Sequence, residues 1–491
     1  MLAGSQGVLV GRRWLVFVVL LSTVAFGRDL GGPVDCDQIA LWTASAVPGR
    51  SLVRLIQQRG IGFNPSPETV NSLASAGADS GLIRQLQATS GAGGDKGNCS
   101  AAVVQVAQLL RQGRHDQAQE KLDSLLSKAP DSPALHFAQG FVRLQQGDLD
   151  EAFDHYSEAK ELMPGFAEIH VRLAYVFYRL DDADNAIAEA RTALSMDPQN
   201  AEAYRYLGLA LYSNEQYQAA LHAFEESQDR EPYNPDTYYD MGIAFRGKGD
   251  LSQAARAYRA AIRLNPKFWQ AHSNLGVVLH DLGKFDEAVA EYLEAKRLAP
   301  NEPSVRNNLG NTYCDQQNYD AAIAEFRALF RLDPNWQKGH DFLAKALMVK
   351  QDYPAAIKEL RLAILAHPTG SAEHRVLGQA LLLTGQQQEA VRELRVAVEL
   401  DPDSPLAHHY LGTALFQIER WDDAAQEFQQ ALRLQPTAGN HYALAACLMS
   451  MGNYDQALAE LETASRLEPG QSLYQARKQE LLKLMKEPKP R

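Results

Sequence analysis

Histidine is the residue type in this chain whose spacing could do chemistry. The sequence contains 13 histidines, and seven of them recur at one place in a repeating pattern: His136, His170, His272, His340, His374, His408 and His441. Several imidazoles that converge would bind a transition metal. Packed helices lie about 10 Å apart, however, so histidines in successive helical repeats are too far apart to share an ion. We therefore predict that these side chains have a packing role, and that the chain holds no metal and no other cofactor.

No group of residues has the spacing of a familiar catalytic site. The sequence lacks a glycine-rich phosphate loop, a G-x-S-x-G turn, an H-E-x-x-H helix and a C-x-x-C pair. His408 and His409 are neighbours in sequence, and side chains of neighbours diverge on a helix. We predict that the protein is not an enzyme.

The elements that carry these residues are marked out by proline. Ten prolines follow one another at intervals of 34 residues: Pro130, Pro164, Pro198, Pro232, Pro266, Pro300, Pro334, Pro368, Pro402 and Pro436. Pro469 follows after 33 more. A fixed period of this length is typical of a helical repeat array.

Each repeat carries the pattern of two short antiparallel helices. Counting from the third residue after the preceding proline, positions 4, 7, 8 and 11 form one apolar stripe, and positions 20, 24 and 27 form another. Position 8 is usually Gly or Ala, position 20 is always Ala, and position 24 is large. Small residues allow the two helices to approach closely, and proline ends the second helix. A single hairpin cannot bury both stripes, so neighbouring hairpins must stack.

This pattern resembles the tetratricopeptide repeat family, in an exported bacterial type. One repeat that matches it well contains Gly310, Tyr313, Ala322, Phe326 and Pro334. The resemblance implies an all-α fold, a right-handed superhelical solenoid of helix-turn-helix repeats with a small N-terminal helical module. The predicted domains are a signal peptide at 1–27, the module at 28–87, a flexible linker at 88–98, eleven repeats at 99–470, a capping helix at 471–486 and a frayed tail at 487–491.

In this family, positions 2, 5, 6, 9, 12 and 13 of the first helix line a concave groove. The residues that we predict to contact a partner there are Arg172, Tyr175, Arg205, Tyr206, Tyr239, Asn274, Asn307, Asn308, Asn311, Arg375 and His409. Aromatic and arginine side chains commonly anchor interfaces, and asparagine pairs with the backbone of an extended peptide. The alternative is that these side chains pack between neighbouring repeats.

One known use of such a groove is to clamp a C-terminal carboxylate. Asn311 and Lys338 occupy single places of that clamp. No repeat has Lys at position 5, and Phe342 stands where the clamp needs Arg. The sequence does not support a carboxylate clamp.

The N-terminal region indicates export. Arg12 and Arg13 precede an uncharged apolar run from Trp14 to Phe26, which is too short to span a bilayer. Ala25 and Gly27 supply small residues at the two positions that a signal peptidase reads. We expect cleavage near Gly27, or else an uncleaved N-terminal anchor. Cys36 and Cys99 bracket the predicted module and form a candidate disulfide in an oxidising compartment, whereas Cys314 and Cys447 should be free.

The formal net charge of −12 argues against nucleic acid as a partner. We predict a periplasmic or secreted scaffold whose groove binds an extended peptide or helix of a partner protein, with no stable membrane insertion once the signal is removed. Two alternatives are an assembly component of an envelope, secretion or pilus machine, and an accessory that presents substrates to a separate enzyme. The sequence fixes neither the partner nor the oligomeric state.

Overall fold

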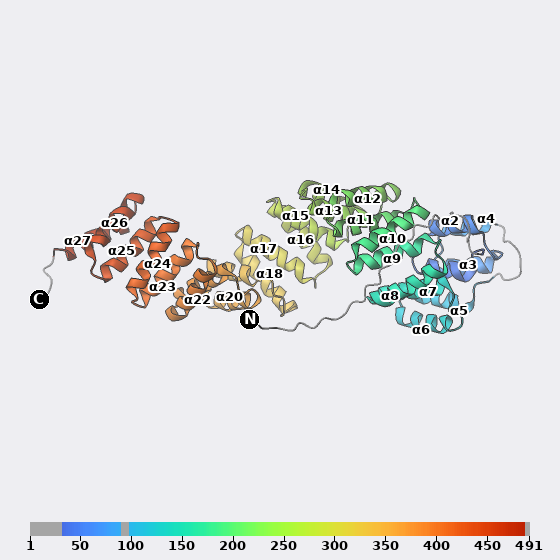
Figure 1. Ribbon diagram of the computed structural model, residues 1–491, viewed down its shortest axis with the longest axis horizontal. Helices are drawn as coiled ribbons and strands as arrows, with labels where there is room; N and C mark the ends of the chain where they lie inside the picture. Colours follow the sequence, from blue (N-terminus) through green and yellow to red (C-terminus); the bar gives the residue numbers. More distant parts are fainter. Residues whose placement is uncertain (1–31, 90–97, 487–491) are drawn as a thin grey trace, which may run out of the picture. The chain divides into compact units, whose positions relative to one another are not determined.

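The computed structural model describes residues 32–89 and 98–486 (Figure 1). In these ranges the chain forms 27 α-helices and no strand, apart from an isolated parallel bridge between Val34 and Ile61. The predicted all-α repeat fold is confirmed. The predicted signal peptide, most of the predicted linker and the predicted tail lie outside the described residues. The chain divides into one unit that ends at Asn214 and a second that begins at Glu215.

The first unit contains the N-terminal module and the first repeats. The module helices are α1 (Cys36–Ala44), α2 (Gly49–Arg59), α3 (Pro67–Ala76) and α4 (Ser80–Ala88). The repeat helices are α5 (Ala101–Arg111), α6 (His115–Leu126), α7 (Pro133–Gln146), α8 (Leu149–Leu162), α9 (Ala167–Arg179), α10 (Ala183–Met196) and α11 (Ala201–Ser213). One hydrophobic core runs through the module and helices α5 to α9. Trp42 is fully buried in it, and its ring centroid lies 4.7 Å from that of Phe166, just before α9.

A disulfide joins Cys36 at the start of α1 to Cys99 just before α5, with 4.9 Å between their Cα atoms. It therefore ties the module to the first repeat. Cys314 and Cys447 are free thiols.

The second unit continues the array. Its helices are α12 (Tyr217–Arg230), α13 (Pro235–Gly247), α14 (Leu251–Leu264), α15 (Trp269–Asp281), α16 (Phe285–Leu298), α17 (Pro303–Asp315), α18 (Tyr319–Leu332), α19 (His340–Val349), α20 (Tyr353–Ala366), α21 (Ser371–Leu383), α22 (Gln387–Leu400), α23 (Pro405–Gln417), α24 (Trp421–Leu434), α25 (Ala438–Ser450), α26 (Tyr454–Leu467) and α27 (Ser472–Leu484). The last helix, α27, covers the end of the array. Its Tyr474 ring packs on the Tyr442 ring, with 5.3 Å between the ring centroids.

Close approach of the two helices in each hairpin explains the residues at positions 8, 20 and 24. The position-20 alanines from Ala118 to Ala457 are all fully buried. A Cβ at Gly276 would lie 2.7 Å from the Tyr292 ring, and a Cβ at Gly310 would lie 2.8 Å from the Phe326 ring. Glycine is therefore needed wherever an aromatic ring of the second helix lies against the first. No helix in the described ranges has the length and apolar character that crossing a bilayer requires.

Candidate functional site

Repeat eight, residues 337–370, begins differently from its neighbours. Its first helix, α19, has 10 residues, whereas α17 before it and α21 after it each have 13. The missing turn is replaced by a short loop that ends at Gly339, whose φ of +95° is a left-handed conformation suited to glycine. The chain thus lacks one helical turn at the start of this repeat.

The loop coincides with the loss of a core side chain. In seven other repeats, position 3 of the first helix holds a side chain that is at most 5% exposed: Leu135, Ile169, Ala203, Thr237, Ala271, Val305 and Ala407. The same position is Gly339 in repeat eight and Glu373 in repeat nine. Two successive repeats therefore lack the small or apolar side chain that would fill this layer. The sequence carries this signal at Gly339 and Glu373, but position 3 is not among the predicted groove positions.

A cavity of about 320 Å³ lies at this place, and we call it the asparagine pocket. It is lined by Asn307, Asn311, Gln337, Lys338, Gly339, Asp341, Phe342, Ala363, His367 and Glu373. The side-chain oxygens of Asn307 and Asn311 are buried and accept no hydrogen bond from the described residues. Buried polar atoms are rarely left without a partner, so two of them at one pocket indicate a place for a ligand.

The charged groups of the asparagine pocket are incompletely paired. Within the described residues, Glu373 and Lys338 form no ion pair, and the nearest cation to Asp341 is the Lys345 ammonium, at 3.9 Å. That ammonium also lies 4.9 Å from the centroid of the Phe342 ring. The pocket therefore combines two carboxylates, two unpaired amide oxygens and an aromatic face.

A second hollow of about 170 Å³ adjoins the same loop. It is lined by Pro334, Asn335, Trp336, Gln337, His340, Leu362, Leu365 and Ala366. The Trp336 indole N–H is buried there without a partner among the described residues, and Leu365 is 78% exposed. The irregular start of repeat eight thus creates two recesses.

The structure brings some predicted groove residues together, and it engages others in contacts within the chain. Asn307, Asn308 and Asn311 lie together on α17, and two of them line the asparagine pocket. Asn274 donates a hydrogen bond to the Tyr239 hydroxyl (3.0 Å), and His409 contacts the side-chain oxygen of Asn440 (2.7 Å). Arg375 on α21 is half-buried and lies outside the pocket lining. Asn274 and His409 therefore bridge neighbouring repeats, as the packing alternative had it.

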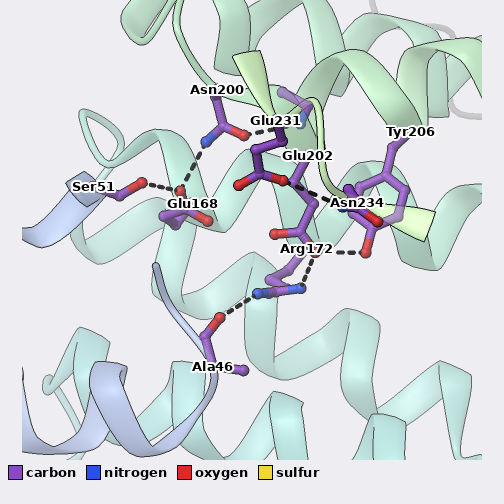
Figure 2. Close-up of polar contacts among 10 residues, drawn as sticks. Ala46, Ser51, Glu168, Arg172, Asn200, Glu202, Tyr206, Glu231 and Asn234 are labelled. Atoms are coloured by element: carbon purple, nitrogen blue, oxygen red, sulfur yellow. Dashed lines mark hydrogen bonds and ion pairs between the residues drawn. The ribbon is translucent and has the colours of Figure 1, made fainter. Parts of the chain in front are cut away.

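Arg172 is not open to a partner, so its predicted groove role is wrong. Its guanidinium donates to the Ala46 carbonyl of the module (2.9 Å) and to Glu202 (3.0 Å) (Figure 2). Tyr206 is also wrong as an exposed groove residue, since it is buried and donates to Glu202 (2.8 Å). The module covers this part of the first unit, which sequence periodicity alone did not reveal.

Tyr175 and Arg205 lie beside this cluster and are half-buried. The Tyr175 ring lies 5.0 Å from the Tyr206 ring and its hydroxyl accepts a hydrogen bond from Arg179 (2.9 Å). The Arg205 guanidinium lies 5.8 Å from the Tyr206 ring centroid. These two residues form a small aromatic and cationic surface in the first unit.

Glu168 anchors the module from the repeat side. Its carboxylate accepts hydrogen bonds from the Ser51 hydroxyl on α2 (2.6 Å) and from the Asn200 amide (2.8 Å) (Figure 2). Burial raises the pKa of the Glu168 carboxyl, and the nearby Glu202 charge adds to this. Burial acts on Glu202 in the same direction, but the Arg172 guanidinium outweighs it and lowers the pKa of Glu202. The contact is thus a buried polar network and not an exposed binding surface.

Six of the seven repeated histidines contact a glutamate of the second helix, whereas His136 contacts His155 (3.2 Å). In repeat six, His272 Nδ1 lies 2.7 Å from Glu291 Oε2, and its Nε2 lies 3.3 Å from the Pro266 carbonyl oxygen. The same side-chain contact recurs between His170 and Glu189, His340 and Glu359, His374 and Glu393, His408 and Glu427, and His441 and Glu460. In the described ranges, no group of three or more His, Cys, Asp or Glu side chains has the geometry of a metal site.

Sequence models of the tetratricopeptide repeat match residues 108–165, 171–235, 239–303, 303–336 and 415–481, and a TPR repeat model matches 378–418. Together they cover well over half of the chain. This chain belongs to the tetratricopeptide repeat family. Tetratricopeptide repeat proteins bind protein partners. The matches leave out residues 337–377, which contain the irregular tetratricopeptide repeat and Glu373.

Solved tetratricopeptide repeat structures resemble parts of the chain. MamA is 26% identical over 32% of this chain and 93% of its own, with a TM-score of 0.29. YrrB, described as a TPR protein with an unusual peptide-binding site, is 23% identical over 40% of this chain and 97% of its own, with a TM-score of 0.33. Pseudomonas aeruginosa pilF is 21% identical over 43% of this chain and 97% of its own, with a TM-score of 0.39. No curated protein matches the chain.

Proposed function

We propose that this protein is an exported, non-catalytic scaffold that binds an extended segment of a partner protein at the asparagine pocket. The observation that carries the proposal is the pair of buried, unpartnered oxygens on Asn307 and Asn311 beside a cavity of about 320 Å³. A buried polar atom without a hydrogen-bond partner lowers the stability of the fold. Its presence is therefore explained if a ligand supplies the missing hydrogen bond. An extended segment that displaces the residues covering these oxygens would supply the missing donors through its backbone N–H groups.

Export is supported by two features of the N-terminal part. The apolar run after Arg12 and Arg13 has the character of a secretory signal. The disulfide between Cys36 and Cys99 suits an oxidising compartment, because such bonds are rare where thiols are kept reduced.

The proposal is tested by capturing partners from an extract of the producing cells with the full chain and with the Asn307→Ala, Asn311→Ala double variant. Because both oxygens lack partners, the variant should unfold at the same temperature as the wild type or slightly higher. It should nevertheless lose its main partner. Gln417→Ala, an exposed position on α23, is the matched control. Retention of every partner by a folded double variant would refute recognition at this pocket and would favour an assembly role for another surface.

A further inference from the structure

The groups that line the asparagine pocket are unbalanced in hydrogen-bonding character. The side-chain oxygens of Asn307 and Asn311 and the carboxylates of Asp341 and Glu373 are all acceptors. The lining contains one permanent cation, Lys338, which is exposed at the rim. Acceptors thus outnumber charged donors in the pocket lining.

Burial makes a missing hydrogen bond on these acceptors costly. Asn307 is 9% exposed, and its unpartnered oxygen is fully covered, so it cannot exchange its missing hydrogen bond for bulk water. Glu373 stands at a position that is buried in most other repeats and forms no ion pair with the described residues. A carboxylate in such a recess is stabilised by a cation that enters it.

The aromatic wall favours the same ligand chemistry. The Lys345 ammonium already lies 4.9 Å from the Phe342 ring centroid, which shows that this ring accepts a cation on its face. A ligand cation in the pocket would thus meet carboxylates, amide oxygens and an aromatic ring together. An anionic ligand would meet Lys338 in the lining and Lys345 beside Phe342, against two carboxylates of like charge.

We infer that the asparagine pocket takes a lysine or arginine side chain of the bound partner segment. This inference rests on the proposed function, since the basic side chain would belong to the segment that the groove binds. The pocket would recognise an ammonium or guanidinium group. A free polyamine also carries ammonium groups and is the other source of such a ligand.

The experiment is a selection of random ten-residue peptides, displayed on phage, against the full chain. Peptides that depend on the pocket are those lost with Asn307→Ala, Asn311→Ala. These peptides should share one Lys or Arg, and its replacement by Gln should weaken binding at least tenfold. If pocket-dependent peptides lack a common basic residue, the inference is overturned while the proposed function stands. If no selected peptide depends on the pocket, both are overturned.

Charge variants provide the second readout. Asp341→Asn with Glu373→Gln should weaken the selected peptides about tenfold, whereas Asp403→Asn with Glu399→Gln, an exposed pair that changes net charge equally, should not. Lys338→Gln should leave affinity unchanged or raise it. Loss of binding in Lys338→Gln would mean that the ligand is anionic, and would contradict the inference. Displacement of a selected peptide by micromolar spermidine would assign the pocket to a free polyamine and would also contradict it.

Discussion

The backbone of Gly339 lies directly over the side-chain oxygen of Asn307. A Cβ at residue 339 would stand 2.8 Å from Asn307 Oδ1 and 3.0 Å from the Phe326 ring, and the φ of +95° is one that other residues adopt at a cost. The asparagine pocket therefore depends on a residue without a side chain at this point.

Gly339→Ala should destabilise repeat eight by about 1–2 kcal/mol through backbone strain, with a further loss from the clash. Hydrogen exchange of α17 and α19 measures this locally. Gly385→Ala is the control, because its φ is +76° and a Cβ there has no neighbour within 4 Å. Equal losses in the two variants would show that contact with Asn307 and Phe326 contributes nothing.

The His272–Glu291 contact predicts a pH dependence of stability. The hydrogen bond from the ring to Glu291 is the main cause that raises the pKa of His272, and burial opposes it. A histidine pKa that is higher in the folded state stabilises the fold fully below the ordinary value of about 6.5, and this contribution is lost as pH rises through the folded pKa. Both ring nitrogens face acceptors, which the protonated ring satisfies.

His272→Gln should therefore lower the stability of α15 and α16 more at pH 6 than at pH 9. Hydrogen exchange over this range measures it, with exposed His222→Gln as the control. A loss of stability that is the same at both pH values would contradict a contribution from the charged ring.

The buried cluster around Arg172 predicts that the module is released when its polar contacts are broken. Arg172→Ala leaves the Glu202 carboxylate and the Ala46 carbonyl without this donor, and loss of one partner of a buried pair typically costs about 3–5 kcal/mol. Exchange should accelerate in α1, α2 and α9. Arg191→Ala, on an exposed face of α10, should leave it unchanged. Unaltered protection of the module in Arg172→Ala would mean that apolar packing alone holds it.

The disulfide should stabilise the first unit because it lowers the conformational entropy of the unfolded chain. Closing a loop with a sequence separation of 63 residues contributes about 4 kcal/mol in the chain-entropy model. Cys36→Ser with Cys99→Ser should lower the free energy of unfolding of this unit by about that amount, as measured with denaturant. Reduction of the wild type should reproduce the variant, and no response to a reductant would contradict the prediction.

The repeated hairpins could be predicted from sequence because each is fixed by local spacing. Gly310 and Phe326, for example, occupy positions that the 34-residue pattern already pairs, and the structure places them in contact. The start of α19 could not be predicted from that pattern, because the proline at 334 keeps its place while Gly339 removes a buried side chain. Periodicity predicts where the two helices of a repeat lie, but it does not predict that the first turn of a helix is unwound.

The predicted groove residues show the same limit. Asn311 and Arg172 both occupy groove positions, yet only Asn311 lines a pocket, because Arg172 is covered by the module. The docking of the module depends on contacts between residues far apart in sequence, such as Ser51 and Glu168. No spacing rule in the repeats reports such contacts.

Site-specific photocrosslinking shows whether a partner segment lies in the asparagine pocket. A benzophenone side chain at Gln337, in the pocket lining, is compared with one at Glu399, an exposed position on α22. We expect a crosslink to the partner from position 337 and none from position 399. A partner that binds the chain but crosslinks only from position 399 would contradict it.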